Sequence, residues 1–419
     1  MSRVLPDLTP LRTSPGFRLL FISRTTTALG AQAAEVTVLV QAKQLTGSPL
    51  TVGLLGVAEL VPLIALGLYG GVLADRFDRR ALMRWCEVGL ACCAALLLAN
   101  SLLPHPSVVV LFVLVAATVA VMSAQRPSLD ASFPRLVPAH QLTAAGALMS
   151  LSQNISFVLG ASLGGALAVA PGPWLMYALD AAGFGVSFFF LSRLQPLPRL
   201  AGSGSAPPPV WREIAAGLRY AVSRRDLLGS YAADLAAMFF AYPNALFPFM
   251  AASLHAPWSA GLMFTAPSVG AIAASALSGW MGRVRRHGVA IALAAGAWGV
   301  AITGFGLAPD LYVALGCLVA AGAADEVSGV FRQTLWNQTI PDELRGRLAG
   351  VELLSYGIGP SAGQLRSGVT ASLTSVRFSL VSGGVCCVGG VVAVCALLPA
   401  LVRYRADELP GAVPAEDLG

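Results

Sequence analysis

Residues Gly70 to Arg80 read GGVLADRFDRR and lie where a long apolar stretch, Thr51 to Leu73, gives way to charge. Glycines at the end of an apolar helix allow neighbouring backbones to approach closely. The run then turns to charge, with Asp75 ahead of three arginines. Arginines in a short loop between membrane helices hold that loop on the cytoplasmic side. The run therefore predicts a short cytoplasmic hinge between two membrane-spanning helices.

The composition of the whole chain agrees with a membrane protein. Its 419 residues are 56% apolar and only 11% charged, whereas soluble domains average about 25% charged residues. Because so few charges cannot cover a water-soluble surface, most side chains must face lipid or other helices. A net charge of +6 would also suit a nucleic acid. The arginines lie between apolar spans, however, so we expect no nucleic-acid partner.

The apolar stretches have the lengths of membrane spans. A helix needs about 20 residues to cross the hydrocarbon core of a bilayer. On this basis we expect an all-α integral membrane fold with twelve spans. They lie near 17–42, 50–74, 81–103, 107–127, 142–169, 173–193, 227–251, 258–281, 288–307, 311–332, 347–372 and 378–402.

The basic residues predict how the chain is oriented. Nearly uncharged turns, such as Thr46–Pro49 and Pro104–Pro106, alternate with connections that carry arginines. All but four of the 27 Lys and Arg residues fall on the side of both termini, the four being Lys43, Arg377, Arg24 and Arg366. Cytoplasmic loops carry the excess of positive charge. We therefore expect a multi-pass protein of the inner (cytoplasmic) membrane with both termini in the cytoplasm.

The longest connection divides the predicted spans into two groups of six. It contains PLPRLAGSGSAPPP and then WREIAAGLRYAVSRR, in which Trp211, Ile214, Leu218 and Val222 share one helix face. This pattern is typical of an amphipathic helix on the membrane surface. We expect cytoplasmic tails at 1–16 and 403–419, six-helix bundles at 17–193 and 227–402, and a cytoplasmic linker at 194–226.

A second charged hinge, GWMGRVRR at Gly279 to Arg286, follows the eighth span as the first hinge follows the second span. The same feature at corresponding places in both halves indicates an internal duplication. We expect two pseudo-symmetric bundles that move as units about a central cavity.

The first hinge resembles the signature loop G-x-L-A-D-R-x-G-R-K/R of the major facilitator superfamily. The matching residues are Gly71, Leu73, Ala74, Asp75, Arg76, Arg79 and Arg80, while Asp78 stands where the family usually has glycine. The resemblance implies the major facilitator fold, with twelve transmembrane helices in two six-helix bundles. It also implies a secondary active transporter that works by alternating access, in which this loop takes part in gating.

Four further segments are similar to the branch of the superfamily that contains the bacterial enterobactin exporter. They are PGFRLLFISR at 15–24, LTGSPLTVGLLG at 45–56, RPSLDASFPRLVPAHQL at 126–142 and NQTIPDELRGRLAG at 337–350. This resemblance implies export of a small organic molecule, first of all a siderophore. Export of drugs or antibiotics by an antiporter of the same superfamily is the alternative.

A glycine-rich element in the fifth span is similar to the G-P-x-x-G-G element associated with antiporters. Gly160, Gly164 and Gly165 match it, and Ala161 replaces the proline. Gly359 and Pro360 supply a glycine-proline pair at the corresponding place in the second half. The element implies antiport, with protons as the coupled ion.

Two acidic residues flank the first outer turn and are candidates for proton coupling. Glu35 comes about 12 residues before the turn and Glu59 about 10 after it, which places both roughly 15–18 Å below the outer surface. If the two carboxylates face one another, they can share a proton. Alternatively they point to different helix faces and bond to Gln32, Thr37 or the backbone. A third alternative is that Glu35 alone is the coupling group.

Other ionisable residues within the spans are candidates for proton or substrate contact, because such groups usually face a cavity or a partner. Asp325 and Glu326 are adjacent, so they point about 100° apart and only one can face a cavity squarely. Ion pairing of either with Arg332 or Arg366 is the alternative. Asp234 is either a coupling group or half of a salt bridge at the gate.

For four further charged residues we expect local roles. Asp180 and Glu352 fall on spans predicted to be peripheral, so structural roles are expected for both. Arg126 and Asp130 are four residues apart and can form an ion pair along one helix. The alternative is a gate latch in which they join Asp75.

The motifs of other function classes are missing from the sequence. It contains no H-E-x-x-H, P-loop or C-x-x-C pattern, so we expect neither an enzyme nor ATP-driven transport. We expect no metal and no cofactor, and the proton gradient as the energy source. The expected partners are a small-molecule substrate and the lipid bilayer, with the monomer as the working unit.

Overall fold

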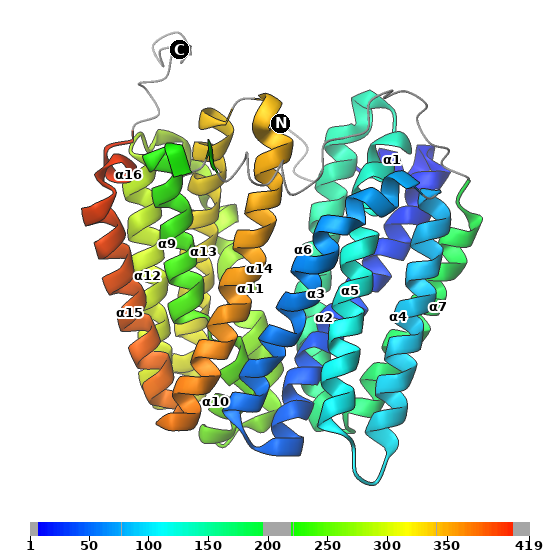
Figure 1. Cartoon of the computed structure of the whole chain (residues 1–419), viewed down its shortest axis with the longest axis horizontal. Helices are drawn as coiled ribbons and strands as arrows, with labels where there is room; N and C mark the ends of the chain where they lie inside the picture. Colours follow the sequence, from blue (N-terminus) through cyan, green and yellow to red (C-terminus); the bar gives the residue numbers. More distant parts are fainter. Residues whose placement is uncertain (1–6, 77, 196–218, 221, 341, 405–419) are drawn as a thin grey trace. The chain divides into compact units, whose positions relative to one another are not determined.

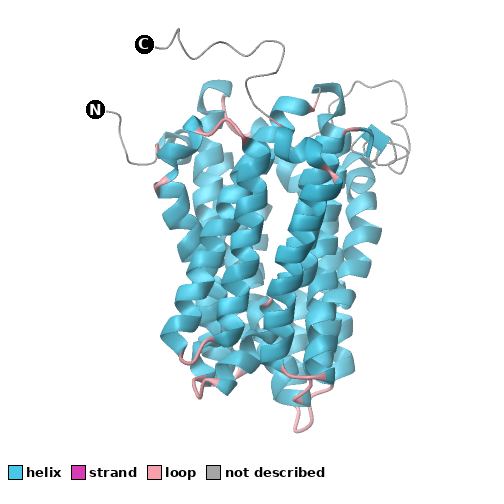
Figure 2. Cartoon of the chain, turned by 90° about the vertical axis from the view of Figure 1, so that its left-hand side faces the viewer, coloured by secondary structure: helices cyan, strands magenta, loops and turns pink. Residues whose placement is uncertain are grey.

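The computed structural model describes residues 7–76, 78–195, 219–220, 222–340 and 342–404. Within these ranges the chain forms helices and short loops and contains no strand (Figures 1 and 2). Of the described helices, ten are long and apolar enough to cross a membrane. This confirms the all-α membrane fold.

Two further helices are long but more polar. α2 (Pro15–Thr46) and α14 (Asp342–Leu373) have 32 residues each, more than a span requires. α2 carries Arg18, Arg24, Glu35 and Lys43, which lowers its mean hydropathy. The count of twelve spans therefore stays a prediction.

The described contacts divide the chain into two compact units. Unit 1 consists of 1–47, 57–207 and 257–265, and unit 2 of 48–56, 208–256 and 266–419. Both are described separately below. Most of the predicted amphipathic helix (Trp211, Ile214, Leu218), residues 1–6 of the predicted N-terminal tail and residues 405–419 of the predicted C-terminal tail lie outside the described residues.

Unit 1 contains the first helices of the chain. They are α1 (Thr9–Thr13), α2, α3 (Pro49–Arg76) from its third turn, α4 (Arg79–Leu102), α5 (Val108–Ser132), α6 (Leu142–Val169) and α7 (Pro173–Arg193), with short 3₁₀ turns at Phe133–Arg135 and Ala139–Gln141. α2 packs against both α6 and α7, and α4 packs against α5 and α7. These contacts enclose the interior in which the candidate site lies.

Unit 2 contains most of the remaining helices. They are α9 (Arg225–Ala241), α10 (Phe247–Ser253), most of α11 (Ala260–Ala276), α12 (His287–Leu307), α13 (Leu311–Thr339), α14, α15 (Val376–Leu397) and α16 (Pro399–Arg403), with 3₁₀ turns at Asn244–Leu246 and Ser278–Arg283. A further 3₁₀ turn at Pro257–Ser259 belongs to unit 1. α12 packs on α13 and α15, and α9 packs on α14 and α15.

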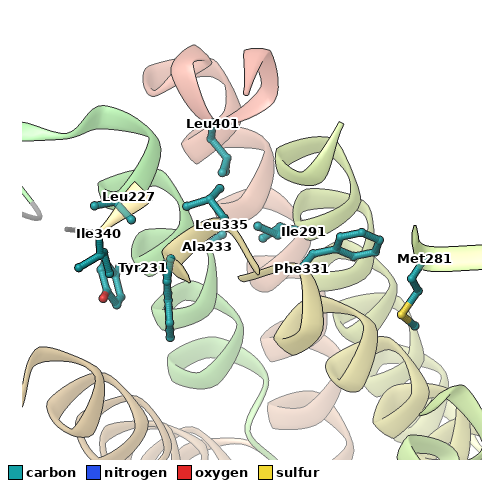
Figure 3. Packing of buried hydrophobic residues seen from close by; sticks show 10 residues of the cluster. Leu227, Tyr231, Ala233, Met281, Ile291, Phe331, Leu335, Ile340 and Leu401 are labelled. Atoms are coloured by element: carbon teal, nitrogen blue, oxygen red, sulfur yellow. The ribbon is translucent and has the colours of Figure 1, made fainter. Parts of the chain in front are cut away.

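An apolar cluster fills one end of unit 2 (Figure 3). Leu227, Leu335 and Leu401 are fully buried there, and they come from α9, α13 and α16. Tyr231 stacks on Trp336 with ring centroids 4.9 Å apart. The cluster joins helices that are far apart in sequence, and therefore fixes the end of this unit.

The seventh and eighth predicted spans are not continuous α-helices. The chain leaves the helix after Ala241, and Tyr242 is extended (φ −81°, ψ 113°) ahead of Pro243. Proline disfavours the helical conformation of the preceding residue and lacks an N–H for the helix ladder. The eighth span likewise ends as α-helix at Ala276 and continues as a 3₁₀ turn.

Polar side chains define several helix ends. Ser107, Asp310 and Ser375 accept hydrogen bonds from backbone N–H groups in the first turns of α5, α13 and α15. Gly47 closes α2 with φ +60°, a left-handed conformation that glycine adopts without strain. These ends agree with the turns expected from the sequence.

Glycines permit the closest helix contact of unit 1. A Cβ at Gly160 would lie 2.7 Å from the carbonyl oxygen of Leu29 on α2. Gly164, one turn further along α6, faces the backbone of Ala33 still more closely. Small residues at helix contacts are the means by which membrane helices pack, because lipid offers no hydrophobic driving force.

We expect Gly164→Ala to lower the thermal unfolding midpoint, because the added methyl group meets the Ala33 backbone. Gly146 on the same helix is the matched control, since nothing lies within 4 Å of a Cβ there. Gly146→Ala should leave the midpoint unchanged or raise it, in line with a helix-propensity gain of about 1 kcal/mol. Both midpoints are measured by heating detergent-solubilised protein and recording the remaining folded fraction by fluorescence-detected size-exclusion chromatography. Equal midpoints for the two variants would contradict the close contact.

Candidate functional site

A cavity of about 220 Å³ lies inside unit 1. Helices α2, α3, α4, α5 and α7 supply its walls. Most of the lining is apolar and comprises Ala31, Ala34, Val38, Leu90, Ala94, Leu97, Val115, Val119, Met122 and Phe184. The polar lining residues are Gln32, Glu35, Glu59, Thr118 and Asp180. Three carboxylates thus share one largely apolar cavity, and its lining contains no basic residue.

Glu35 and Glu59, the two candidates from the sequence, meet at this cavity. Gln32 Nε2 donates a hydrogen bond to Glu35 Oε2 at 2.9 Å. No hydrogen bond reaches the Glu59 carboxylate from the part of the chain that the structure describes. The two carboxylates interact electrostatically. The structure thus combines two of the alternatives, because the acids line one cavity and Glu35 also bonds to Gln32.

Asp180 is the third carboxylate of the cavity and comes from α7. Asp180 as a whole residue is only 5% exposed. A Cβ at Gly30 of α2 would collide with Asp180 Oδ1, so the carboxylate lies against the α2 backbone. The sequence favoured a structural role for Asp180. Because Asp180 lines the cavity, a role in proton or substrate contact becomes an alternative.

Glu87 is a buried acid of unit 1 that the sequence analysis missed. It is 1% exposed on α4. Gln125 Nε2 donates to Glu87 Oε1 at 2.8 Å, and Thr27 Oγ1 lies 3.3 Å from both carboxylate oxygens. Glu87 falls inside the predicted third span, so the rule that singled out Glu35 and Glu59 would have found it.

In unit 2 an arginine neutralises the buried acid. Arg332 on α13 forms an ion pair with Asp234 on α9, and both side chains are less than 5% exposed. Arg332 also lies 3.9 Å from Asp325, whose side chain is 44% exposed. A buried pair of this kind is stable only with both partners present. The geometry therefore agrees with the ion-pair alternatives for Asp234 and Asp325.

Glu326 points away from that pair. Ser275 Oγ on α11 donates a hydrogen bond of 2.6 Å to Glu326 Oε1. Asp325 and Glu326 thus have different partners, because adjacent residues on a helix point about 100° apart.

The hinge after α3 has two structural anchors among its described side chains. Asp78 Oδ1 accepts from the backbone N–H of Ala81 at 2.8 Å and caps α4. Arg80 donates to the carbonyl oxygens of Leu191 and Ser192 in the last turn of α7. A cation there is favoured by the helix dipole. The surroundings of Gly71 and the side chains of Asp75 and Arg76 are outside the part of the chain whose side chains the structure describes.

Asp130 receives two arginines at the end of α5. Arg24 Nη1 donates to it at 3.1 Å, and Arg126 Nε lies 3.9 Å away. Asp130 is 53% exposed and Arg126 67% exposed, and exposed pairs contribute only about 0–1 kcal/mol. The partner from α2, 106 residues away in sequence, could not be read from spacing.

The glycine elements lie at close helix contacts in both halves. Gly165 of α6 approaches Gly261 of α11 within unit 1. In unit 2, Gly359 directly precedes Pro360 of α14. A Cβ at Gly359 would lie 2.9 Å from Met238 of α9. Packing accounts for these glycines without any reference to antiport.

Among the described residues, the helices long and apolar enough to cross a membrane define a multi-pass membrane protein. Solved transporters share the fold. The nucleoside transporter NupG matches with a TM-score of 0.72 at 13% identity, covering 93% of this chain and 100% of that one. A bacterial homolog of the human lysosomal transporter Spinster matches with a TM-score of 0.72 at 14% identity, covering 95% and 98%.

The sequence comparisons give the family. The model described as "Transmembrane secretion effector" matches residues 6–411. The enterobactin exporter EntS of Citrobacter koseri is 31% identical, with 96% of each chain covered. That of Escherichia coli O1:K1 / APEC is 30% identical, with 99% of this chain and 98% of the relative covered. The chain belongs to this transmembrane secretion effector family of the major facilitator superfamily.

We expect Asp234→Asn to destabilise the protein by about 3–5 kcal/mol, because it leaves the Arg332 charge buried without its carboxylate. Asp325→Asn is the control, since that carboxylate is more exposed and further from Arg332, and its effect should be below about 1 kcal/mol. Thermal unfolding in detergent compares the two. The double variant Asp234→Asn/Arg332→Gln should regain part of the loss, and a double variant less stable than the single one would contradict a buried pair.

Proposed function

We propose that this chain exports a siderophore of the enterobactin type out of the cell. Transport would run by alternating access and be driven by protons moving inward, which makes the chain an antiporter. No cofactor is required, because the proton gradient supplies the free energy. The substrate is a small organic molecule, and the protein works as a monomer within the lipid bilayer of the cytoplasmic membrane.

The observation that carries the proposal is the full-length similarity to exporters of enterobactin. Identity of 30–31% extends over at least 96% of this chain and of each of these two relatives. Similarity across both halves favours a common mode of transport, whereas a match confined to one motif would support only the superfamily.

The acidic cavity of unit 1 supports protons as the coupled ion. A carboxylate in an apolar cavity is costly unless it is paired, protonated or bound to a cation. Glu35 has one hydrogen bond from Gln32, and Glu59 has none from the described residues. Both groups can therefore exchange protons as the cavity opens to water on one side or the other, which antiport requires.

The charge distribution supports the direction in which the chain crosses the membrane. With the arginine-rich connections on the cytoplasmic side, both termini and the linker 194–226 face the cytoplasm. The bundles 17–193 and 227–402 then serve as the two moving bodies. The hinge residues Gly71, Asp75, Arg76, Arg79 and Arg80 serve as the gate, with Arg126 and Asp130 as a latch.

Efflux of drugs or antibiotics is the second candidate, and one feature favours it. The cavity of unit 1 combines apolar walls with carboxylates, which suits a small apolar cation better than a catechol ligand. For a siderophore exporter the same cavity is the proton site, and the ligand is bound elsewhere.

We expect deletion of this chain from an iron-starved siderophore producer to reduce siderophore in the medium at least tenfold, with build-up inside the cells. The measurement is the siderophore concentration in medium and cell extract, with re-expression of the chain as the control. Unchanged secretion would refute the siderophore assignment. Efflux of cationic dyes and antibiotics from the same strains would then test the second candidate.

We expect Glu59→Gln and Glu35→Gln each to abolish proton-driven siderophore accumulation in inverted vesicles, because each removes a titrating group from the cavity. Exchange of labelled for unlabelled siderophore without a gradient should survive, since binding and alternating access remain. Asp7→Asn, outside the predicted spans, is the control carboxylate. Wild-type accumulation that persists after a protonophore collapses the gradient would contradict proton coupling.

A further inference from the structure

Asp180 is a buried carboxylate to which the proposed mechanism assigns no role. It is 5% exposed and lines the cavity of Glu35 and Glu59. Within the described ranges, neither a hydrogen bond nor an ion pair reaches its carboxylate. A group that makes no polar contact does not hold helices together, so structural packing gives no reason for an acid at this position.

The ionisable neighbours of Asp180 are acids and one tyrosine. The titratable groups near it are Glu35 on α2, Glu59 on α3, Glu87 on α4 and Tyr177 on its own helix. Tyr177 donates its hydroxyl hydrogen to Gln41 Oε1 at 2.6 Å. The described lining of the cavity contains no lysine, arginine or histidine. Among the described residues no group of His, Cys, Asp and Glu is placed to hold a metal ion.

Glu87 extends the series of polar groups from the cavity into the interior of unit 1. It interacts electrostatically with Asp180 and accepts from Thr27 and Gln125. Thr27 Oγ1 also lies 3.1 Å from Ser187 Oγ. The hydroxyls of Ser187 and Ser23 are 2.6 Å apart. Hydroxyl groups can both donate and accept, so this chain of contacts can pass a proton along.

The register of two helices places these groups in one line. On α7, Asp180 and Ser187 are seven residues apart and lie on one face, a rise of about 10 Å. On α2, the residues Gly30, Thr27 and Ser23 also span seven positions, and α2 runs along them in the direction opposite to α7. The polar groups therefore form a column inside unit 1, which starts at the cavity.

An apolar cluster closes the far end of the column. Leu20 and Leu191 lie one turn beyond Ser23 and Ser187, and both are fully buried with Met83 and Leu194. Water cannot reach the serines through a packed apolar cluster. The column is therefore open at the cavity and closed at the end where α2 begins.

We propose that Asp180 and Glu87 form a proton path inside unit 1, which connects the cavity of Glu35 and Glu59 with Ser187 and Ser23. The path deepens the proposed proton coupling and rests on it. In each transfer a proton leaves a carboxylic acid, directly or through a water, and joins the neighbouring carboxylate. The number of protons on the path changes only where it meets water.

Infrared difference spectra after a pH step test the path without any siderophore. Full-length protein in lipid nanodiscs would show the carbonyl signal of protonated carboxyl groups. We expect Asp180→Asn to remove part of this signal and to slow the change at Glu87 at least tenfold, and Glu87→Gln to remove part of the signal without slowing the rest. Asp7→Asn should match wild type. Gly30→Ala keeps every carboxyl group but displaces Asp180, so it should slow the change without removing signal.

Transport assays separate this inference from the proposed function. We expect Asp180→Asn to lose proton-driven accumulation while retaining siderophore exchange, with Asp180→Glu restoring part of it. If wild type moves no siderophore, the proposed function fails, and the spectra still decide whether the path exists. Spectra of Asp180→Asn and Glu87→Gln identical to wild type would overturn the path. A wild-type signal that tetramethylammonium suppresses at constant pH would also overturn it, in favour of an organic-cation site.

Discussion

A carboxylate in a low-dielectric interior is the costliest group that a membrane helix can carry, and the two units of this chain accommodate it differently. In unit 2, Arg332 neutralises Asp234. In unit 1, the cavity brings Glu35, Glu59 and Asp180 together without a basic residue in its lining. A neutralised pair is a stable structural element, whereas acids without a cation respond to protons. This difference is the reason for proposing that unit 1 handles the protons.

Close backbone contacts determine where these acids can lie. Asp180 rests against α2 because Gly30 has no side chain, and α6 reaches α2 because Gly160 and Gly164 have none. A larger residue at any of these positions would widen the helix contact and change the volume of the cavity. The glycines that suggested antiport by resemblance thus have a physical effect, which is to set the spacing of α2, the helix that carries Glu35.

Local patterns in the sequence predicted the fold well. Hydrophobic length predicted the ten described helices that are apolar enough to cross a membrane, and turn residues predicted most helix ends to within a few residues. The break at Pro243 was readable from the same rules. Partners distant in sequence were not readable, because pairs such as Arg24 with Asp130 or Ser23 with Ser187 depend on which helix faces meet. The cavity itself depends on five helices and has no local signature.

The hinge departs from its family pattern at Asp78, where again a polar group has a hydrogen-bond partner. Asp78 replaces the usual glycine and caps α4 through Ala81, so its charge satisfies a backbone donor instead of standing free. Arg80 holds the last carbonyl groups of α7, the helix on which Asp180 and Ser187 lie. A motion of the hinge would therefore pull on α7 directly. Through that helix, gating at the membrane surface and proton transfer in the interior would be mechanically connected.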